Sequence, residues 1–383
     1  MRRICVITTS RADYSIYTPI LKQIQEHPEL RLQLVVSGMH LSPEFGFTVQ
    51  AIEADGFEIA DRIEMLLSSD TPEATAKSMG LGMIGFAQTY ARSRPDLLLV
   101  LGDRFEMHAA VTAALPFTLP VAHIHGGERS EGAIDDSLRH SITKMSHLHF
   151  VATEEYKRRV IQMGEEPWRV IHSGAPGLDN VLTTKFLSRA ELQRQFSVNL
   201  REPFLLVTYH PATLEQEDTA RQIEDLLQAL NEVNATVIFT SPNADVRSHA
   251  IRERIREYAR QSDRAQLVMS LGTEGYFSMM RHAAAMVGNS SSGIIEAASL
   301  KLPVVNIGNR QHGRVRARNV VDVDCNRQQI VDGIRQAMTQ QFRDSLSDLS
   351  NPYGDGHAAA RILQTLASVK LDNKLVTKRF HEA

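Results

Sequence analysis

Short apolar runs alternate with longer amphipathic segments along this chain, and this alternation limits the folds that it can adopt. Residues 4–9 (ICVITT) are rich in β-branched side chains, and residues 15–27 behind them carry apolar side chains at helical spacing. Strands that are apolar on both faces need cover on both faces, and parallel strands need crossover helices between them. The pattern therefore predicts an α/β fold built on parallel sheets.

The pattern occurs twice. The first series of apolar runs comprises residues 4–9, 32–37, 97–102, 121–125 and 148–153, and the second comprises 204–210, 236–241, 266–270, 285–288 and 303–308. A stretch rich in Gly, Pro and Asn at 173–180 separates the two series and is typical of a linker. We expect two Rossmann-like doubly wound domains with a central cleft, residues 1–178 and 179–354, with residues 355–383 able to pack back on the first domain.

Composition excludes several classes of protein. Lys plus Arg number 42 and Asp plus Glu 45, so bulk charge favours neither nucleic acid nor a membrane surface as partner. The two cysteines, Cys5 and Cys325, are too few for a disulfide framework. The first apolar run is too short for a signal peptide, and no run reaches transmembrane length. We expect a cytoplasmic protein without nucleic-acid or membrane partners.

In doubly wound sheets, ligands bind where the strands end. The first run leads into a predicted helix whose N-terminus, with Arg11, could attract an anion, although Ser10 or Asp13 could simply cap that helix. No GxGxxG motif follows, which argues against a dinucleotide cofactor. After the run at 97–102 come Asp103 and Arg104, which are either an ion pair that ties loops together or a catalytic carboxylate beside a phosphate-binding arginine.

The run at 121–125 leads to His125, two glycines and Glu128, and Asp135 and Asp136 follow. The glycines could let the backbone approach a ligand, and carboxylates near an imidazole suit proton transfer at carbon. One aspartate can cap the next helix while the other faces the site. His123, His125 and Glu128 could also suggest a metal, but His123 lies within an apolar run and fits a core histidine better, so we expect no metal.

The second series carries the clearest anion signal. Residues 288–293 (GNSSSG) place hydroxyls and glycine at a strand-to-helix junction, which favours a diphosphate cradle that includes Ser290 and Ser291. Glu296 could accept from ribose hydroxyls or could simply favour the helix dipole. Residues 308–318 contain four arginines, of which Arg310 is the candidate for a polyanionic ligand.

Two further strand ends are polar. His210 ends the run at 204–210 and could act as an acid, a base or a phosphate donor. Asn243 lies in the polar loop after the run at 236–241.

Taken in order, these motifs resemble the hydrolysing UDP-N-acetylglucosamine 2-epimerases. The set is SRADYS, LGDR, HIHGGE, DDSLRH, YHP, SPNAD, GNSSSGIIEA and GNRQHGR, and it covers most of the chain. The stretch ITKMSHLHFVATEEYKRRVIQMGE is similar to the bacterial members that begin sialic-acid synthesis. The resemblance implies a glycosyltransferase-B-like fold, a homodimer or homotetramer, and no nicotinamide cofactor or metal. It also implies elimination of UDP from UDP-N-acetylglucosamine to 2-acetamidoglucal, which water then converts to N-acetylmannosamine.

The resemblance also implies roles for individual residues. Asp103, Asp135 and His210 match catalytic positions. The positions that match UDP contacts are Arg11, Ser15, Arg104, His210, Asn243, Ser290, Ser291, Glu296 and Arg310. One departure is that His125 stands where many members have Glu, so either His125 or Glu128 transfers the proton.

Other functions remain open. The same reaction could act on UDP-2,4-diacetamido-2,4,6-trideoxyglucose, the substrate of legionaminic-acid pathways. A glycosyltransferase of the same fold would need an acceptor sugar, and a sensor would bind UDP without turnover. A non-hydrolysing epimerase is disfavoured by the DDSLRH pattern.

Overall fold

A computed structural model describes residues 1–69, 71–131, 134–210, 219–240 and 248–382. The chain divides into two compact units. The first unit comprises Met1–Glu128, Asp135–Asn180 and Tyr353–Ala383, and the second comprises Arg129–Ile134 and Val181–Pro352. Residues 129–134 thus belong to the second unit, although the segments before and after them belong to the first. The predicted division, with its boundary after residue 178, did not include this short excursion.

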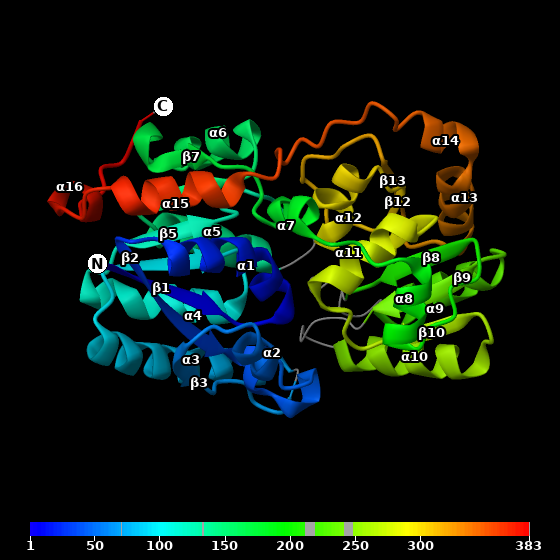
Figure 1. Cartoon of the computed structure of the whole chain (residues 1–383), viewed down its shortest axis with the longest axis horizontal. Helices are drawn as coiled ribbons and strands as arrows, with labels where there is room; N and C mark the ends of the chain where they lie inside the picture. Colours follow the sequence, from blue (N-terminus) through cyan, green and yellow to red (C-terminus); the bar gives the residue numbers. More distant parts are fainter. Residues whose placement is uncertain (70, 132–133, 211–218, 241–247, 383) are drawn as a thin grey trace. The chain divides into compact units, whose positions relative to one another are not determined.

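The first unit contains a seven-stranded parallel sheet of order β3-β2-β1-β4-β5-β6-β7, and several of its strands are labelled in Figure 1. Its strands are β1 (Arg2–Thr8), β2 (Leu30–Ser37), β3 (Ile59–Ile63), β4 (Leu97–Leu101), β5 (Val121–Ile124), β6 (Leu148–Val151) and β7 (Val170–His172). Every residue of β4, β5 and β6 is buried. Apolar side chains on both faces of these strands explain why their sequences do not alternate.

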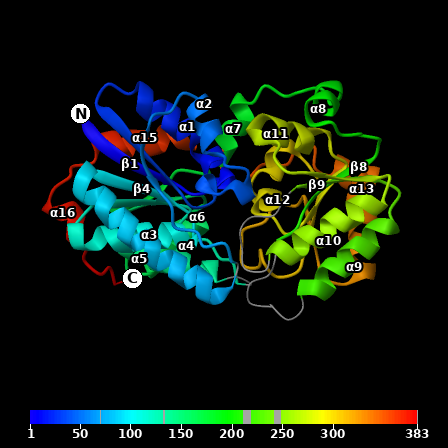
Figure 2. The same cartoon turned by 90° about the horizontal axis from the view of Figure 1, so that it is seen from below.

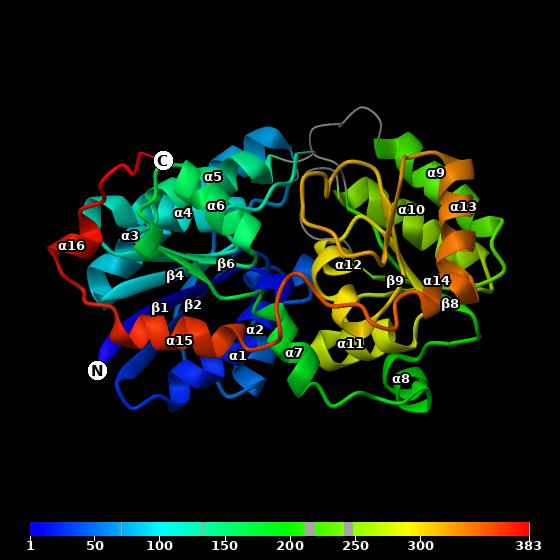
Figure 3. The same cartoon turned by 90° about the horizontal axis from the view of Figure 1, so that it is seen from above.

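Helices cover this sheet. They are α1 (Arg11–Glu26), α2 (Val49–Ala54), α3 (Pro72–Ser93), α4 (Phe105–Ala114), α5 (Asp135–Met145), α6 (Glu154–Gln162), α15 (Ala358–Ser368) and α16 (Asn373–Val376). Helix α3 lies beside α4 (Figure 2), and the C-terminal α15 lies beside α1 (Figure 3). Asp179 holds the start of α15, because its carboxylate accepts from the backbone N–H groups of Ala358 at 2.9 Å and Ala359 at 2.7 Å. Asp179 belongs to α7 (Gly177–Thr183), the helix within which the chain leaves the first unit.

The second unit repeats the architecture with six parallel strands in the order β10-β9-β8-β11-β12-β13. The strands are β8 (Phe204–Thr208), β9 (Thr236–Thr240), β10 (Ala265–Val268), β11 (Ala285–Gly288), β12 (Val304–Ile307) and β13 (Val320–Val323). The helices are α8 (Arg189–Phe196), α9 (Thr219–Asn231), α10 (Ser248–Gln261), α11 (Gly272–His282), α12 (Ser291–Ile295), α13 (Arg327–Met338) and α14 (Gln340–Asp344). Alternate side chains of β8 enter two separate cores, Leu205 and Val207 in one and Phe204 and Leu206 in the other.

Both sheets share one winding. From β1 the chain moves outward to β3 and then returns to place β4 on the other side of β1, and β8 to β11 follow the same course. The predicted α/β class with two Rossmann-like doubly wound domains is therefore confirmed. Within the described residues, no helix is both long and apolar enough to cross a membrane.

Candidate active site

The β1–α1 junction is closed by a capping box. The Asp13 carboxylate accepts from the backbone N–H groups of Thr9 at 3.1 Å and Ser10 at 3.0 Å, and the Ser10 hydroxyl accepts from the N–H of Asp13. The interpretation of Ser10 and Asp13 as helix caps is confirmed. Arg11 is the first residue of α1, and burial lowers the pKa of its guanidinium. Ser15 lies one turn further along the same helix, where its carbonyl accepts from the Asn180 amide at 2.6 Å.

Asp103 and Arg104 directly follow β4 and Gly102. Arg104 binds Glu106 through two hydrogen bonds of 3.0 Å, and burial raises the pKa of Glu106 in spite of this cation. The Asp103 carboxylate instead accepts from Arg139 of α5, which is buried. Each charge is therefore paired, but with a different partner, so an ion pair between these two neighbours does not describe this junction. Sequence reasoning did not single out Arg139.

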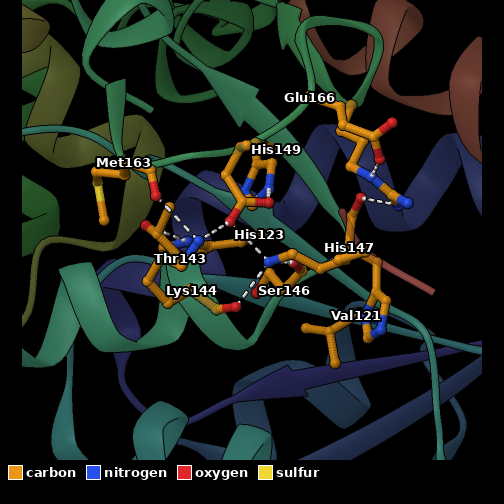
Figure 4. Close-up of polar contacts among 12 residues, drawn as sticks. Val121, His123, Thr143, Lys144, Ser146, His147, His149, Met163 and Glu166 are labelled. Atoms are coloured by element: carbon orange, nitrogen blue, oxygen red, sulfur yellow. Dashed lines mark hydrogen bonds and ion pairs between the residues drawn. The ribbon is translucent and has the colours of Figure 1, made fainter. Parts of the chain in front are cut away.

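His123 is a core histidine. Its Nε2–H donates to the Gly102 carbonyl at 2.7 Å, and its Nδ1 lies 3.3 Å from the Thr143 hydroxyl (Figure 4). Burial lowers the pKa of His123 to about 3, so the ring stays neutral near pH 7. The interpretation from its apolar neighbours is confirmed.

The two glycines after His125 serve the packing of the protein itself. A Cβ at Gly126 would lie 3.0 Å from His123 Nδ1 and 3.1 Å from Thr143 Oγ1. Gly127 has φ of +77°, and a Cβ there would lie 2.7 Å from the Tyr156 carbonyl. Protein atoms therefore occupy the space that a side chain at either position would need, which explains both glycines by packing, and the approach of a ligand to this backbone stays a prediction.

His125 and Glu128 form one buried pair. His125 Nδ1 lies 2.5 Å from Glu128 Oε1, and the side chains are 8% and 1% exposed. The φ of His125 is +65°, a region that side-chain-bearing residues rarely adopt, and its backbone N–H donates to Phe150 at 3.0 Å. Strained backbone held by its surroundings often marks a functional residue. The carboxylate orients the imidazole, as a third group does in other acid–base sites.

Asp135 and Asp136 lie in the first turn of α5, and both are half-buried. Asp136 contacts His140 at 3.5 Å and Arg139 at 3.9 Å. The structure thus brings Asp103, His125, Glu128 and Asp135 onto the ends of β4 and β5 and the helix that follows them.

In the second unit, Asn289 joins the ends of β8 and β11. Its side-chain oxygen accepts from the backbone N–H of His210 at 2.7 Å, and its amide nitrogen donates to the His210 carbonyl at 2.8 Å. The Asn289 carbonyl accepts from Gln311 at 2.8 Å and from Arg310 at 3.3 Å. Gly288 permits this approach, because a Cβ there would lie 2.0 Å from the Thr208 carbonyl. Asn289 therefore contacts two predicted site residues, His210 after β8 and Arg310 after β12, on either side of β11.

The serine-rich turn begins α12. The Ser290 hydroxyl accepts from the Ser292 backbone N–H at 3.4 Å, Ser291 is the first helical residue, and Glu296 ends the helix buried. Tyr276 of α11 lies close enough to this turn for Ser290, Ser292 and Glu296 to affect the pKa of its hydroxyl. Burial, with the nearby charge of Glu296, raises the pKa of Tyr276 to about 12, so it remains a neutral donor.

Sequence reasoning missed Asn289, Gln311 and Tyr276. Asn243 lies outside the described residues. Over the part of the chain that is described, no group of three or more His, Cys, Asp or Glu side chains is placed to hold a metal ion.

Comparison with known proteins places this chain in a family. A family model described as UDP-N-acetylglucosamine 2-epimerase matches residues 22–367. A UDP-N,N'-diacetylbacillosamine 2-epimerase (hydrolyzing) of Legionella pneumophila is 38% identical over 99% of both chains. A GDP/UDP-N,N'-diacetylbacillosamine 2-epimerase (hydrolyzing) of Campylobacter jejuni is 39% identical over 98% of this chain and 97% of its own. The polysialic acid biosynthesis protein P7 of Escherichia coli is 36% identical over 98% and 96%.

Solved structures agree on the fold. The crystal structure of UDP-GlcNAc 2-epimerase from Neisseria meningitidis bound to UDP-GlcNAc has a TM-score of 0.82 and 18% identity, and the match covers 96% of this chain and 99% of that one. Near-complete matches to curated relatives and a family model that spans most of the sequence lead to one conclusion: this chain belongs to the UDP-N-acetylglucosamine 2-epimerase family.

Proposed function

We propose that this protein is a hydrolysing 2-epimerase that converts a UDP-activated 2-acetamido sugar and water to UDP and the free sugar inverted at C2. Membership of the family supports the reaction class. The observation that carries the proposal is the buried pair of His125 and Glu128 near the end of β5, beside Asp103 at the end of β4. Inversion at C2 needs one proton removed and another returned, and two acid–base groups at adjacent strand ends suit that need.

The chemistry we propose has two stages. Asp103, whose carboxylate pairs with Arg139, accepts the C2 proton while UDP leaves C1, so that a 2-acetamidoglucal forms. His125 then gives C2 a proton on the opposite face, the water oxygen bonds to C1, and the proton that this water releases returns to His125, while Asp103 loses its proton to solvent. We assign this proton exchange to His125 and make Glu128 the group that orients its ring, since their hydrogen bond is 2.5 Å long. Asp135 stands as a further acid–base candidate.

Most of the nucleotide contacts we propose belong to the second unit. The Ser290 and Ser291 hydroxyls, the start of α12 and Arg310 suit a diphosphate, because they combine neutral donors with a guanidinium. His210 supplies an imidazole to the leaving diphosphate, and Glu296 accepts from the ribose hydroxyls. Arg11, Ser15, Arg104 and Asn243 keep the UDP contacts expected from the sequence. Such charge stabilisation of the leaving group is needed because the C2 proton is only weakly acidic.

Within this class, we favour UDP-2,4-diacetamido-2,4,6-trideoxyglucose as the substrate. The support is that two relatives of 38% and 39% identity are named for the UDP-activated diacetyl sugar N,N'-diacetylbacillosamine. UDP-N-acetylglucosamine is the second candidate, which the description of the matching family model favours. The homodimer or homotetramer expected from the sequence stays a prediction.

A direct comparison of the two nucleotides tests the proposal. Purified protein is incubated with each one separately, and free UDP is measured by a coupled assay over a range of concentrations. We expect kcat/KM to be at least tenfold higher for the diacetamido nucleotide. A reversed ratio would move the assignment to UDP-N-acetylglucosamine. If the protein binds UDP but releases none from either nucleotide, the hydrolysing epimerase is rejected and a transferase that lacks its acceptor is favoured.

A further inference from the structure

Arg139 is a buried cation that contacts the proposed catalytic carboxylate of Asp103. It lies on α5 with its side chain 1% exposed, and its Nη2 donates to Asp103, which is 20% exposed. Burying a guanidinium is costly unless its charge is compensated, so this placement needs a reason. Asp103 supplies the compensating charge, and Asp136 on the same helix lies 3.9 Å from Nη1.

A closed set of contacts ties this pair to the end of β4. The Thr143 hydroxyl, one turn after Arg139 on α5, lies 3.0 Å from the Arg139 carbonyl and 3.3 Å from His123 Nδ1. His123 in turn donates from Nε2 to the carbonyl of Gly102 at 2.7 Å. Gly102 and Asp103 are neighbours in the chain, so the His123 contact holds the backbone beside Asp103 and the Arg139 contact holds its carboxylate. Figure 4 shows His123 and Thr143.

The other titratable groups around these strand ends have partners of their own. Arg104 of the β4–α4 junction binds Glu106, and His125 after β5 binds Glu128. On α5, Asp136 also contacts His140 at 3.5 Å. His123 is neutral near pH 7, because burial lowers its pKa to about 3. Among these groups, Arg104 and His125 pair elsewhere, whereas the Arg139 guanidinium contacts Asp103 directly.

We propose that Arg139 is the positioning residue of Asp103, which holds the carboxylate in one orientation and keeps it ionised so that it acts as a base. This inference rests on the proposed function, in which Asp103 accepts the C2 proton. The planar guanidinium suits the task, because it offers several donors in fixed directions, whereas a lysine offers a point charge.

The pH dependence of turnover tests the proposal. We would measure kcat/KM against pH for wild type, R139M, R139K and the control R158M, which removes an exposed arginine of α6. For R139M, we expect turnover near pH 7 to fall about 100-fold or more. We also expect the acid limb of its profile to move up by roughly 1–3 pH units, because an adjacent cation favours the charged form of a carboxylate by about that much. R139K should lie between R139M and wild type, and R158M should match wild type.

A purely structural role would lower turnover and leave the acid limb where wild type has it, and that result would overturn the proposal. R139K retains the positive charge, and the same pH profile is measured on this variant if R139M does not fold. A second measurement does not depend on turnover: proteins labelled with ¹³C-aspartate are titrated by NMR, and the Asp103 signal is assigned by its loss in D103N. The Asp103 carboxylate should titrate at higher pH in R139M than in wild type. An unchanged midpoint would reject the role of Arg139, whereas inactivity of wild type on both nucleotides would reject only the proposed function.

Discussion

Acid should destabilise the first unit before its carboxylates titrate. His147 Nδ1 accepts from the Val121 backbone N–H at 3.1 Å, so the native ring must keep this nitrogen unprotonated. Burial, with the nearby cations Lys378 and Arg169, lowers the pKa of His147 to about 4, whereas the same group titrates near 6.5 in an unfolded chain. Between these values the unfolded state binds more protons, so the free energy of unfolding falls as pH falls from about 6.5 towards 4.

The size of the effect follows from the pKa difference. One pKa unit corresponds to 1.36 kcal/mol, so His147 alone accounts for a loss of about 2.5 kcal/mol between pH 7 and pH 4.5. Burial lowers the pKa of His123 to about 3, so His123 adds a similar loss of unfolding free energy over the same pH range. Together they reach roughly 5 kcal/mol, which is a large share of the 5–15 kcal/mol that folded proteins usually have.

Urea unfolding from pH 7 to pH 4.5 measures this loss. The single tryptophan, Trp168, reports on the first unit, because it belongs to that unit and the Arg169 guanidinium lies 4.2 Å from its ring centroid. H147N keeps an oxygen able to accept from Val121 and cannot gain a proton, so it should lose about 2.5 kcal/mol less than wild type over this range. H249N, at an exposed histidine, is the matched control. A pH dependence of H147N equal to that of wild type would refute the reasoning.

Three further substitutions probe the site. D103N should lower turnover by about 100-fold or more while UDP binds largely as before, measured by coupled assay and calorimetry; lost UDP binding would make Asp103 structural. R310A should weaken UDP binding roughly 10- to 100-fold, since hydrogen bonds to charged groups contribute about 1.5–3 kcal/mol, and unchanged affinity would remove the assigned contact. G288A should lower the melting temperature and UDP affinity together, because the new methyl would lie 2.0 Å from the Thr208 carbonyl. A G288A protein with wild-type affinity and melting temperature would contradict that geometry.

The sequence predicted the fold well because buried parallel strands are almost wholly apolar. Runs such as LLLVL and VAHI stand out from the helices between them, and both form fully buried strands. His123 was also recognised as a core residue, since its neighbours in the run are apolar. In these cases the local sequence carries the physical cause of the structure.

Parts of the site depend on contacts between distant residues, which a local pattern does not contain. Arg139 meets Asp103 across 36 positions, and Asn289 meets His210 across 79. Tyr276 reaches the serine-rich turn from another helix. The packing that favours glycine after His125 could not be read locally either, because the atoms that crowd Gly127 belong to Tyr156 and Val160 on α6.

The central claim is that UDP leaves by elimination and that the resulting glucal is hydrated, and solvent deuterium tests it most directly. The protein is incubated in deuterated water with UDP-2,4-diacetamido-2,4,6-trideoxyglucose, and in parallel with UDP-N-acetylglucosamine, while proton NMR follows the products. The account predicts free UDP and a free manno-configured sugar whose C2 carries deuterium. A free sugar that keeps its original hydrogen at C2 would contradict the account, as would an epimerised product that is still joined to UDP.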